Sequence, residues 1–325
     1  MPTRKSPRKG SLQYWPRKRA TKFLPRVRWN SIKNSEEEKG LKGFIGYKAG
    51  MANAFVSDNT PDSMTKGKTI SLPVTIIECP KLKIFSVRFY KNGQVDTEIL
   101  GEGLDKELKK IIKLPKKSSS KKELEKLEEI SKDYDDVTII CYSVVKNIGL
   151  KKKPDLSEIG LSGSMEEKTK FVKENLGKEL SINDFFSKGE IVDVRGLTKG
   201  KGFSGPVKRF GITLKSHKSE KGVRRPGSIG PWHPARVTFR VPMAGQLGMF
   251  TRVIYNNKII DMNNISESDY ASVLKSLKNY GNVKSDYIIV KGSVQGSVKR
   301  QLLVTKPLRE TKRTKKKNYE LVELK

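Results

Sequence analysis

Three stretches that are rich in Lys and Arg but almost free of acids most constrain what this chain can fold into. Residues 1–35 hold eleven Lys or Arg and no acid, residues 195–260 hold fourteen with one acid, and residues 299–317 hold nine with one acid. The first stretch contains four prolines and no apolar periodicity, which predicts an extended arm without a core of its own. Such a chain folds only in part by itself and leaves cationic segments for a partner.

The rest of the chain differs in both charge and residue type. The 325 residues carry a formal net charge of +32, yet residues 96–190 hold 20 acids, 19 Lys and no Arg. Sixteen of the 17 Arg lie in the three basic stretches. Arg presents a planar fork that pairs bidentately with phosphate and stacks on bases, whereas Lys suits a solvated surface. The distribution predicts a nucleic-acid partner, with RNA favoured and an architectural DNA-binding protein as an alternative.

Aromatic residues are interleaved with the cations of the N-terminal stretch. Tyr14, Trp15, Phe23 and Trp29 alternate with the Lys and Arg of this arm. Beside a folded RNA they can stack on splayed bases while the cations neutralise phosphates. The alternative is an arm that packs its aromatic rings on the parent domain.

Short β-rich runs begin at Gly43, and most are bounded by Gly, Pro, Asn or Asp. Many short strands without alternating helices predict a mainly β fold, either a sandwich or a barrel. The predicted strands cover residues 44–47, 74–78, 84–90, 137–145, 191–194, 237–241, 249–255, 287–290 and 300–304.

The quasi-neutral segment has a helical rather than an alternating apolar pattern. Leu104, Leu108, Ile111 and Ile112 recur at helical spacing, and residues 124–130 and 165–176 repeat the pattern. Ser181 and Asp184 have the spacing of an N-cap pair. Residues 100–190 are therefore predicted to be a mostly helical insertion packed on the β body.

The glycine-rich run Gly200–Gly205 matches the dinucleotide pattern G-x-G-x-x-G and follows a predicted strand. The pattern also requires a helix that starts at the third glycine, but residues 206–211 show no apolar helical period. A glycine-rich turn close to RNA is favoured, and an RNA-modifying or nucleotide-dependent enzyme remains the alternative. With two histidines and no spaced catalytic set, we expect no enzyme activity.

Cofactor and membrane signals are weak in this chain. Cys79 and Cys141 lie far apart without metal-ligand spacing, so buried thiols are expected rather than a disulfide or a zinc site. The N-terminus has no apolar signal-peptide run, and the apolar stretch at residues 137–145 is too short to span a membrane. We expect a cytosolic protein without cofactor, metal, membrane partner or small-molecule substrate.

Several long runs carry a resemblance to a known family. They are IVDVRGLTKGKGFSGPVKRFG from Ile191, RRPGSIGPWHPARV from Arg224, MAGQLGMFTR from Met243, GFIGYKAGMANAFV from Gly43, RKGSLQYWPRKRA from Arg8 and KGSVQGSVKRQLLV from Lys291. The chain resembles the large-subunit ribosomal protein L3 family of the archaeal and eukaryotic kind over nearly its whole length.

This resemblance implies a closed six-stranded translation-protein-type β-barrel, long extended loops, and basic N- and C-terminal arms that run along rRNA. It also implies a role in subunit assembly and a loop that reaches toward the peptidyl transferase centre with Trp232 at its tip. The implied partners are large-subunit rRNA and neighbouring large-subunit proteins, and the implied location is the cytoplasmic ribosome. Eukaryotic members carry a modified histidine where this chain has Glu220, so that modification is not expected here.

The predicted organisation divides the chain into an arm (1–42), a barrel body (43–99 and 191–305) with an RNA-penetrating loop region (195–245), the insertion (100–190) and a basic C-terminal tail (306–325). Cationic and aromatic residues of the basic stretches are the candidate rRNA-binding set. They are Arg8, Trp15, Arg17, Lys18, Arg19, Arg26, Arg28, Lys199, Lys201, Lys208, Arg209, His217, Lys221, Arg224, Arg225, Trp232, His233, Arg236, Arg252, Lys299 and Arg300.

Overall fold

The computed structural model describes residues 8–32, 40–101, 103–115, 133–268 and 270–325. The chain forms two compact units. Unit 1 comprises Met1–Phe23 and Leu197–Arg252, and unit 2 comprises Leu24–Gly196 and Val253–Lys325.

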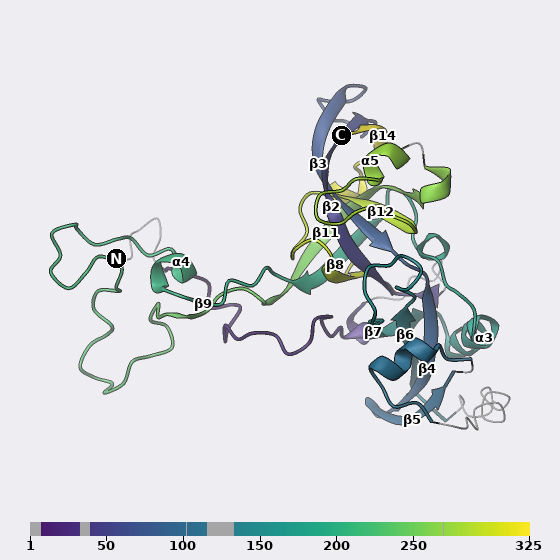
Figure 1. The fold of residues 1–325 in the computed structure, drawn as a ribbon, viewed down its shortest axis with the longest axis horizontal. Coiled ribbons are helices and arrows are strands. Elements are labelled where there is room, and N and C mark those ends of the chain that lie inside the picture. The colour runs from purple at the N-terminus through teal and green to yellow at the C-terminus, as the bar shows by residue number, and fades with distance from the viewer. Residues whose placement is uncertain (1–7, 33–39, 102, 116–132, 269) are drawn as a thin grey trace. The chain divides into compact units, whose positions relative to one another are not determined.

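Six strands form a closed ring of neighbouring hydrogen-bonded strands, in the order β2, β3, β12, β11, β8 and β13 (Figure 1). The ring closes because β13 pairs antiparallel with both β8 and β2, with Leu303 opposite Arg195 on one side and Ile45 on the other. The fold is thus mainly β, as predicted. The six strands are β2 (Gly43–Asp58), β3 (Thr69–Cys79), β8 (Ile191–Leu197), β11 (Thr251–Asn264), β12 (Asp286–Lys291) and β13 (Gln301–Thr305).

The apolar runs that predicted these strands supply the core of unit 2. Phe44, Ile45, Ile77 and Val304 are fully buried in one hydrophobic cluster. Eight of the nine predicted strands are confirmed, with shifted ends. Residues 237–241 are the exception: they form no strand, and Val237 and Phe239 are exposed. Their β propensity finds no partner strand, and propensity alone does not form a sheet.

A second sheet of unit 2 has five strands in the order β1, β7, β6, β4 and β5. The strands are β1 (Gly40–Leu41), β4 (Leu82–Lys91), β5 (Gln94–Leu100), β6 (Asp136–Ser143) and β7 (Leu156–Ser162). Residues 82–99, which were predicted to belong to the barrel body, therefore lie in the segment that forms β4 and β5 of this second sheet.

The prediction of a mostly helical insertion over residues 100–190 is corrected by the described part of that segment. β6 and β7 pair there, and the helices are η2 (Lys106–Lys110), α3 (Met165–Asn175) and η3 (Ile182–Asp184). The helical repeats at residues 104–112 and 165–176 coincide with η2 and α3, whereas β6 is the strand predicted at residues 137–145 and β7 lies in a stretch without a helical repeat. The helix expected near residues 124–130 lies outside the described residues.

Local capping signals were more reliable than the overall assignment of that segment. Helix α3 begins with a capping box in which Ser164 Oγ accepts from the Glu167 N–H at 3.3 Å. The predicted Ser181 and Asp184 pair forms a second capping box at η3. Val172, on the apolar face of α3, is fully buried. Leu108, within η2, is also fully buried, so the predicted apolar face is present on a shorter element.

The C-terminal residues are part of unit 2 rather than a free basic tail. Strand β14 (Tyr319–Leu324) pairs antiparallel with β2, placing Leu324 opposite Ala54, and Leu324 is buried. Apolar residues in the YELVEL sequence pack against a second hydrophobic cluster, and this burial anchors the end of the chain. Short helices complete unit 2, namely η1 (Trp29–Ser31), η4 (Ile265–Glu267), α5 (Ala271–Leu274) and α6 (Lys312–Lys315).

Unit 1 contains little regular structure (Figure 1). Strand β9 (Phe203–Ser204) pairs with β10 (Gly245–Gln246), and α4 (Pro206–Phe210) follows β9 directly. The two cysteines belong to unit 2, and both are free and buried, as predicted. Burial raises the pKa of both thiols.

Candidate nucleic-acid interface

Unit 1 is strongly cationic for its size. Its two segments contain 20 Lys or Arg and a single acid, Glu220. Unit 2 holds the other 47 Lys or Arg and 34 acids. Cations in unit 1 therefore have almost no carboxylates of their own unit to pair with, which is the charge pattern of a phosphate-binding surface.

The N-terminal arm lies against the 197–252 segment within unit 1. The Ala20 N–H donates to the Met249 carbonyl at 2.9 Å, and a terminal N–H of Arg17 donates to the Arg209 carbonyl at 3.0 Å. The ring of Trp15 packs on the ring of Phe239 at a centroid distance of 5.5 Å. Residues 8–23 thus have a defined packing partner although they contain no regular secondary structure.

Arginines and aromatic rings alternate at the junction between arm and loop. The Arg17 and Arg209 guanidinium carbons lie 4.2 Å and 5.1 Å from the centroid of the Phe210 ring, and Arg252 lies 4.3 Å from that of Tyr14. Burial lowers the pKa of Arg17, with further lowering by the charges of Arg209 and Arg252. Burial likewise lowers the pKa of Arg209. Like charges are therefore held close together, and both Arg remain cationic because the ordinary Arg pKa is so high.

Residues 211–244 have few contacts with the rest of unit 1. Nearly every side chain in this range is exposed, and Trp232 is 86 % exposed. Within this segment the Lys215 N–H donates to the Val223 carbonyl at 3.0 Å. Its polar backbone is thus available to a partner.

Seventeen of the 21 predicted site residues lie in unit 1, whereas Arg26, Arg28, Lys299 and Arg300 lie in unit 2. Five of the 21 are half-buried, namely Trp15, Arg17, Arg209, Arg252 and Arg300. The other 16 are exposed: Arg8, Lys18, Arg19, Arg26, Arg28, Lys199, Lys201, Lys208, His217, Lys221, Arg224, Arg225, Trp232, His233, Arg236 and Lys299.

Comparison with known proteins gives the family of this chain. The family model described as Ribosomal protein L3 matches residues 1–325. The chain belongs to the ribosomal protein L3 family. The resemblance seen in the sequence is therefore confirmed.

Several archaeal proteins with the name large ribosomal subunit protein uL3 are similar to this chain. The protein of Methanocaldococcus jannaschii is 40% identical over 313 residues, which cover 93% of this chain and 91% of the relative. That of Methanococcoides burtonii is 40% identical over 314 residues, covering 93% and 92%. That of Methanococcus aeolicus is 41% identical over 316 residues, covering 94% and 92%. As a member of the L3 family, the chain is a structural component of the large ribosomal subunit in the cytoplasm.

The glycine-rich turn of this L3 family member differs from its prediction in one respect. A helix does begin after the third glycine, because Pro206 occupies the first helical position of α4 and Gly211 ends it in the left-handed conformation. The five residues of α4 are far fewer than the helix of a dinucleotide fold requires. Gly202 has φ +62°, which agrees with the predicted turn.

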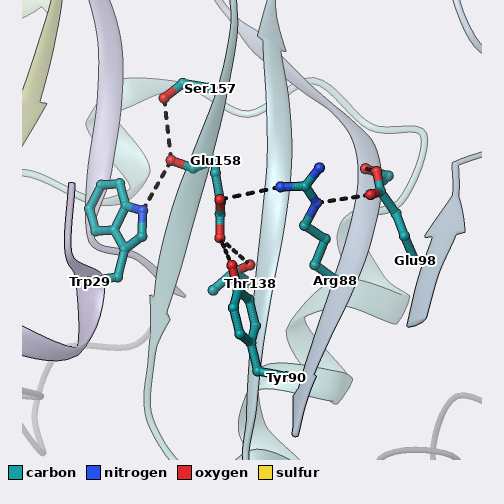
Figure 2. A network of polar contacts seen from close by, with 8 residues as sticks. Trp29, Arg88, Tyr90, Glu98, Thr138, Ser157 and Glu158 are labelled. Carbon is teal, nitrogen blue, oxygen red and sulfur yellow. Dashed lines mark hydrogen bonds and ion pairs between the residues drawn. The ribbon is translucent and has the colours of Figure 1, made fainter. Parts of the chain in front are cut away.

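One aromatic residue of the N-terminal arm is buried rather than exposed. Trp29 lies in unit 2, is 6% exposed, and its indole N–H donates to the Glu158 carbonyl at 3.1 Å (Figure 2). The idea that every arm aromatic stacks on RNA is therefore wrong for Trp29, which packs on its own unit.

Several aromatic and cationic residues of unit 1 were not predicted as site residues. Phe203 and Phe239 are 82% and 55% exposed, Arg240 lies over the Phe239 ring, and Phe210 is the buried ring under two arginines. The available signal was adjacency, since Arg209 precedes Phe210 and Arg240 follows Phe239. Neighbouring cation and ring pairs are a common element of RNA-binding surfaces.

In the described ranges, no helix combines the length and apolar composition needed to cross a membrane. Nor do the described His, Cys, Asp and Glu side chains form a group of three or more that could hold a metal ion.

Proposed function

We propose that this L3 family member binds large-subunit rRNA, with unit 1 as the principal contact, and thereby nucleates subunit assembly. The observation that carries the proposal is the composition of unit 1: 20 Lys or Arg and one acid, together with exposed aromatic rings. Cations neutralise phosphates and screen the self-repulsion of RNA, so distant rRNA segments can pack against each other. Arg26, Arg28, Lys299 and Arg300 add cationic contacts from unit 2.

The 211–244 segment is the part of the proposed interface that reaches the peptidyl transferase centre. Its exposed backbone and its prolines and glycines give it no core, so rRNA phosphates, hydroxyls and bases are the natural partners of its polar groups. The ring of Trp232, exposed at 86 %, contributes about 1–3 kcal/mol if it stacks on one base. By family resemblance, this tryptophan buttresses the catalytic RNA without itself reacting.

The body of the protein is the part that surrounds the closed ring of strands. The ring of six strands fits the translation-protein-type barrel that the family resemblance implies. On this proposal the body lies at the subunit surface, where its remaining surface faces neighbouring proteins.

Salt titration of rRNA binding tests the electrostatic part of this function. If about ten phosphates are neutralised, log affinity falls with log salt at a slope of about −7 to −9. The full-length protein is titrated with large-subunit rRNA in increasing KCl, with duplex DNA at equal nucleotide concentration as competitor. A slope near zero, or displacement by the duplex DNA, would contradict specific rRNA binding.

Reconstituted subunits test the role of the loop tip. Trp232→Ala is expected to fold and to enter large subunits, but to alter binding of aminoacyl-tRNA and peptide-bond formation. The wild-type protein in otherwise identical subunits is the control. Unchanged tRNA binding and peptide-bond formation in purified mutant ribosomes would count against the proposed position of Trp232.

A further inference from the structure

Three half-buried arginines meet where the arm lies on the loop segment of unit 1. Arg17 comes from the arm, whereas Arg209 and Arg252 come from the 197–252 segment. Arg17 and Arg209 share the ring of Phe210, and Arg252 lies over Tyr14 of the arm and, at 5.2 Å, over Phe250. Each of the two segments thus supplies both cations and rings to one cluster.

Neutral backbone oxygens hold these guanidinium groups in place. Arg17 donates to the Arg209 carbonyl at 3.0 Å, and Arg209 donates to the Gln246 carbonyl at 3.0 Å and the Met243 carbonyl at 2.9 Å. Arg252 donates to the Thr251 carbonyl at 2.8 Å. Carbonyl oxygens orient the guanidinium forks but do not cancel their charge.

The cluster therefore concentrates positive charge in a partly desolvated place. The charges of Arg209, Arg252 and Arg8 add to burial in lowering the pKa of Arg17. The sole acid of unit 1, Glu220, lies in the exposed 211–244 segment. An anion bound at the cluster would relieve this repulsion, and a tetrahedral phosphate offers oxygens that match guanidinium forks.

We infer that Arg17, Arg209 and Arg252 form a composite site for one phosphate group, shared by the arm and the loop segment, and that its occupation fastens the arm to the loop. The inference rests on the proposed function, because the rRNA backbone is the source of the phosphate. Phosphate binding and arm docking are then linked, and each strengthens the other by the same factor. The arm is thereby secured where rRNA is present.

Hydrogen exchange of the full-length protein tests the site without RNA. Amide exchange in residues 8–23 is compared in sodium phosphate and in sodium chloride at equal ionic strength and pH. Phosphate at ten times its dissociation constant should slow exchange about tenfold through linkage. Arg252→Gln, and independently Arg17→Lys, should abolish this difference. Arg240→Gln is the matched control, since Arg240 also lies over a phenylalanine ring of unit 1 but outside the cluster, and it should keep the difference.

Equal exchange of residues 8–23 in phosphate and in chloride would overturn the site. It would also be overturned if Arg240→Gln lost the difference between phosphate and chloride as fully as the cluster variants do.

A double-mutant cycle then identifies rRNA as the phosphate source. Because Arg17 and Arg252 share one phosphate, Arg17→Lys and Arg252→Gln should be non-additive in rRNA affinity by about fivefold, whereas Arg252→Gln and Arg240→Gln should be additive. Additivity of the first pair, with intact rRNA binding by the wild type, would overturn the shared site and leave the proposed function standing. Failure of the wild type to bind rRNA would instead contradict the proposed function.

Discussion

The three tryptophans of the chain lie in three different environments. Trp29 is 6% exposed and buried in unit 2, Trp15 is half-buried on Phe239, and Trp232 is 86% exposed. The large apolar side chain of Trp29 fills space next to two glycines, Gly43 and Gly160, where an added Cβ would lie 2.7 Å from an atom of this side chain. The burial of each tryptophan therefore depends on the space and contacts that its neighbours provide.

Alanine substitutions at Trp29 and Trp232 should differ strongly in their effect on the free energy of unfolding. Trp29→Ala leaves a cavity and is expected to lower the free energy of unfolding by about 3–5 kcal/mol. Trp232→Ala removes an exposed ring and is expected to change it by less than about 0.5 kcal/mol. Urea unfolding followed by far-ultraviolet circular dichroism measures both. Similar losses in the two variants would contradict the assigned environments.

The Glu158 carboxylate is contacted by polar side chains from neighbouring strands of the second sheet (Figure 2). Tyr90 and Thr138 donate their hydroxyls to it, and Arg88 lies 3.4 Å away. Burial, and then the hydrogen bond and charge of Glu158, raise the pKa of Tyr90 to about 12. The folded protein thus keeps a proton on Tyr90 that the unfolded chain loses near its ordinary pKa of about 10.

This shift predicts an alkaline loss of stability. Because the folded pKa lies above the unfolded one, the contribution of Tyr90 is complete below about pH 10 and is lost as pH rises toward 12. Tyr90→Phe should unfold with a shallower decline over this window, measured by urea unfolding at pH 9, 10 and 11. Tyrosinate absorbance provides the check, since the variant should lack one group that ionises near pH 12. Identical pH profiles would contradict the shift.

At the scale of elements, local signals were predictable from the sequence and long-range pairings were not. The capping residues Ser164 and Ser181 act on amides a few positions away; the spacing of Ser181 and Asp184 predicted the second cap, and the first is seen in the structure. Strand β7, all of whose residues are buried or half-buried, pairs with β6 across an intervening loop. Strand β14 follows a run of lysines. Because of this charge, the segment was predicted to be a basic tail although β14 contains apolar residues.

For the candidate site, too, the residue types could be predicted from the sequence but the long-range contacts could not. Charge and residue type identified the cationic residues, because exposed Arg without acids requires a partner whatever the fold. The contact of the arm with the 197–252 segment was not predictable, since Ala20 and Met249 are joined by a backbone bond that carries no sequence signal. Trp29 was misassigned for the complementary reason, since its burial depends on two distant glycines.

Gly248 provides a test of the turn that joins β10 to β11. Its φ is +75°, and an added Cβ would lie 1.9 Å from the Lys199 carbonyl oxygen. Gly248→Ala should therefore strain this turn by about 1–3 kcal/mol and loosen the bond from the Lys201 N–H to the Leu247 carbonyl. Hydrogen exchange in residues 197–204 and 245–250 should accelerate.

Gly227→Ala is the matched control for Gly248. A Cβ at Gly227 would meet no atom within 4 Å. The hydrogen-exchange pattern of Gly227→Ala should equal that of the wild-type protein. Unchanged exchange in Gly248→Ala would show that the turn does not require glycine.

On the scale of the whole molecule, charge is divided unequally between two kinds of structure. Unit 1 carries a net +19 from 20 Lys or Arg and one acid, whereas the much longer unit 2 carries +13 from 47 Lys or Arg and 34 acids. Unit 2 offsets most of its charge internally and buries its apolar strands. With one acid among 20 Lys or Arg, unit 1 has the charge pattern that suits an external polyanion.

This division predicts which cations determine the salt dependence of rRNA binding. Replacing Arg224 and Arg225 together by Gln should reduce the magnitude of the salt slope by about 1.4–1.8, because two phosphate contacts are lost. The adjacent exposed pair Lys152 and Lys153 of unit 2 is the matched control, and its double Gln variant should keep the wild-type slope. Filter binding of large-subunit rRNA over a KCl series measures both slopes, and a sedimentation gradient should show the Arg variant depleted from large particles. Equal slopes for the two double variants would mean that net charge alone, rather than its location in unit 1, governs binding.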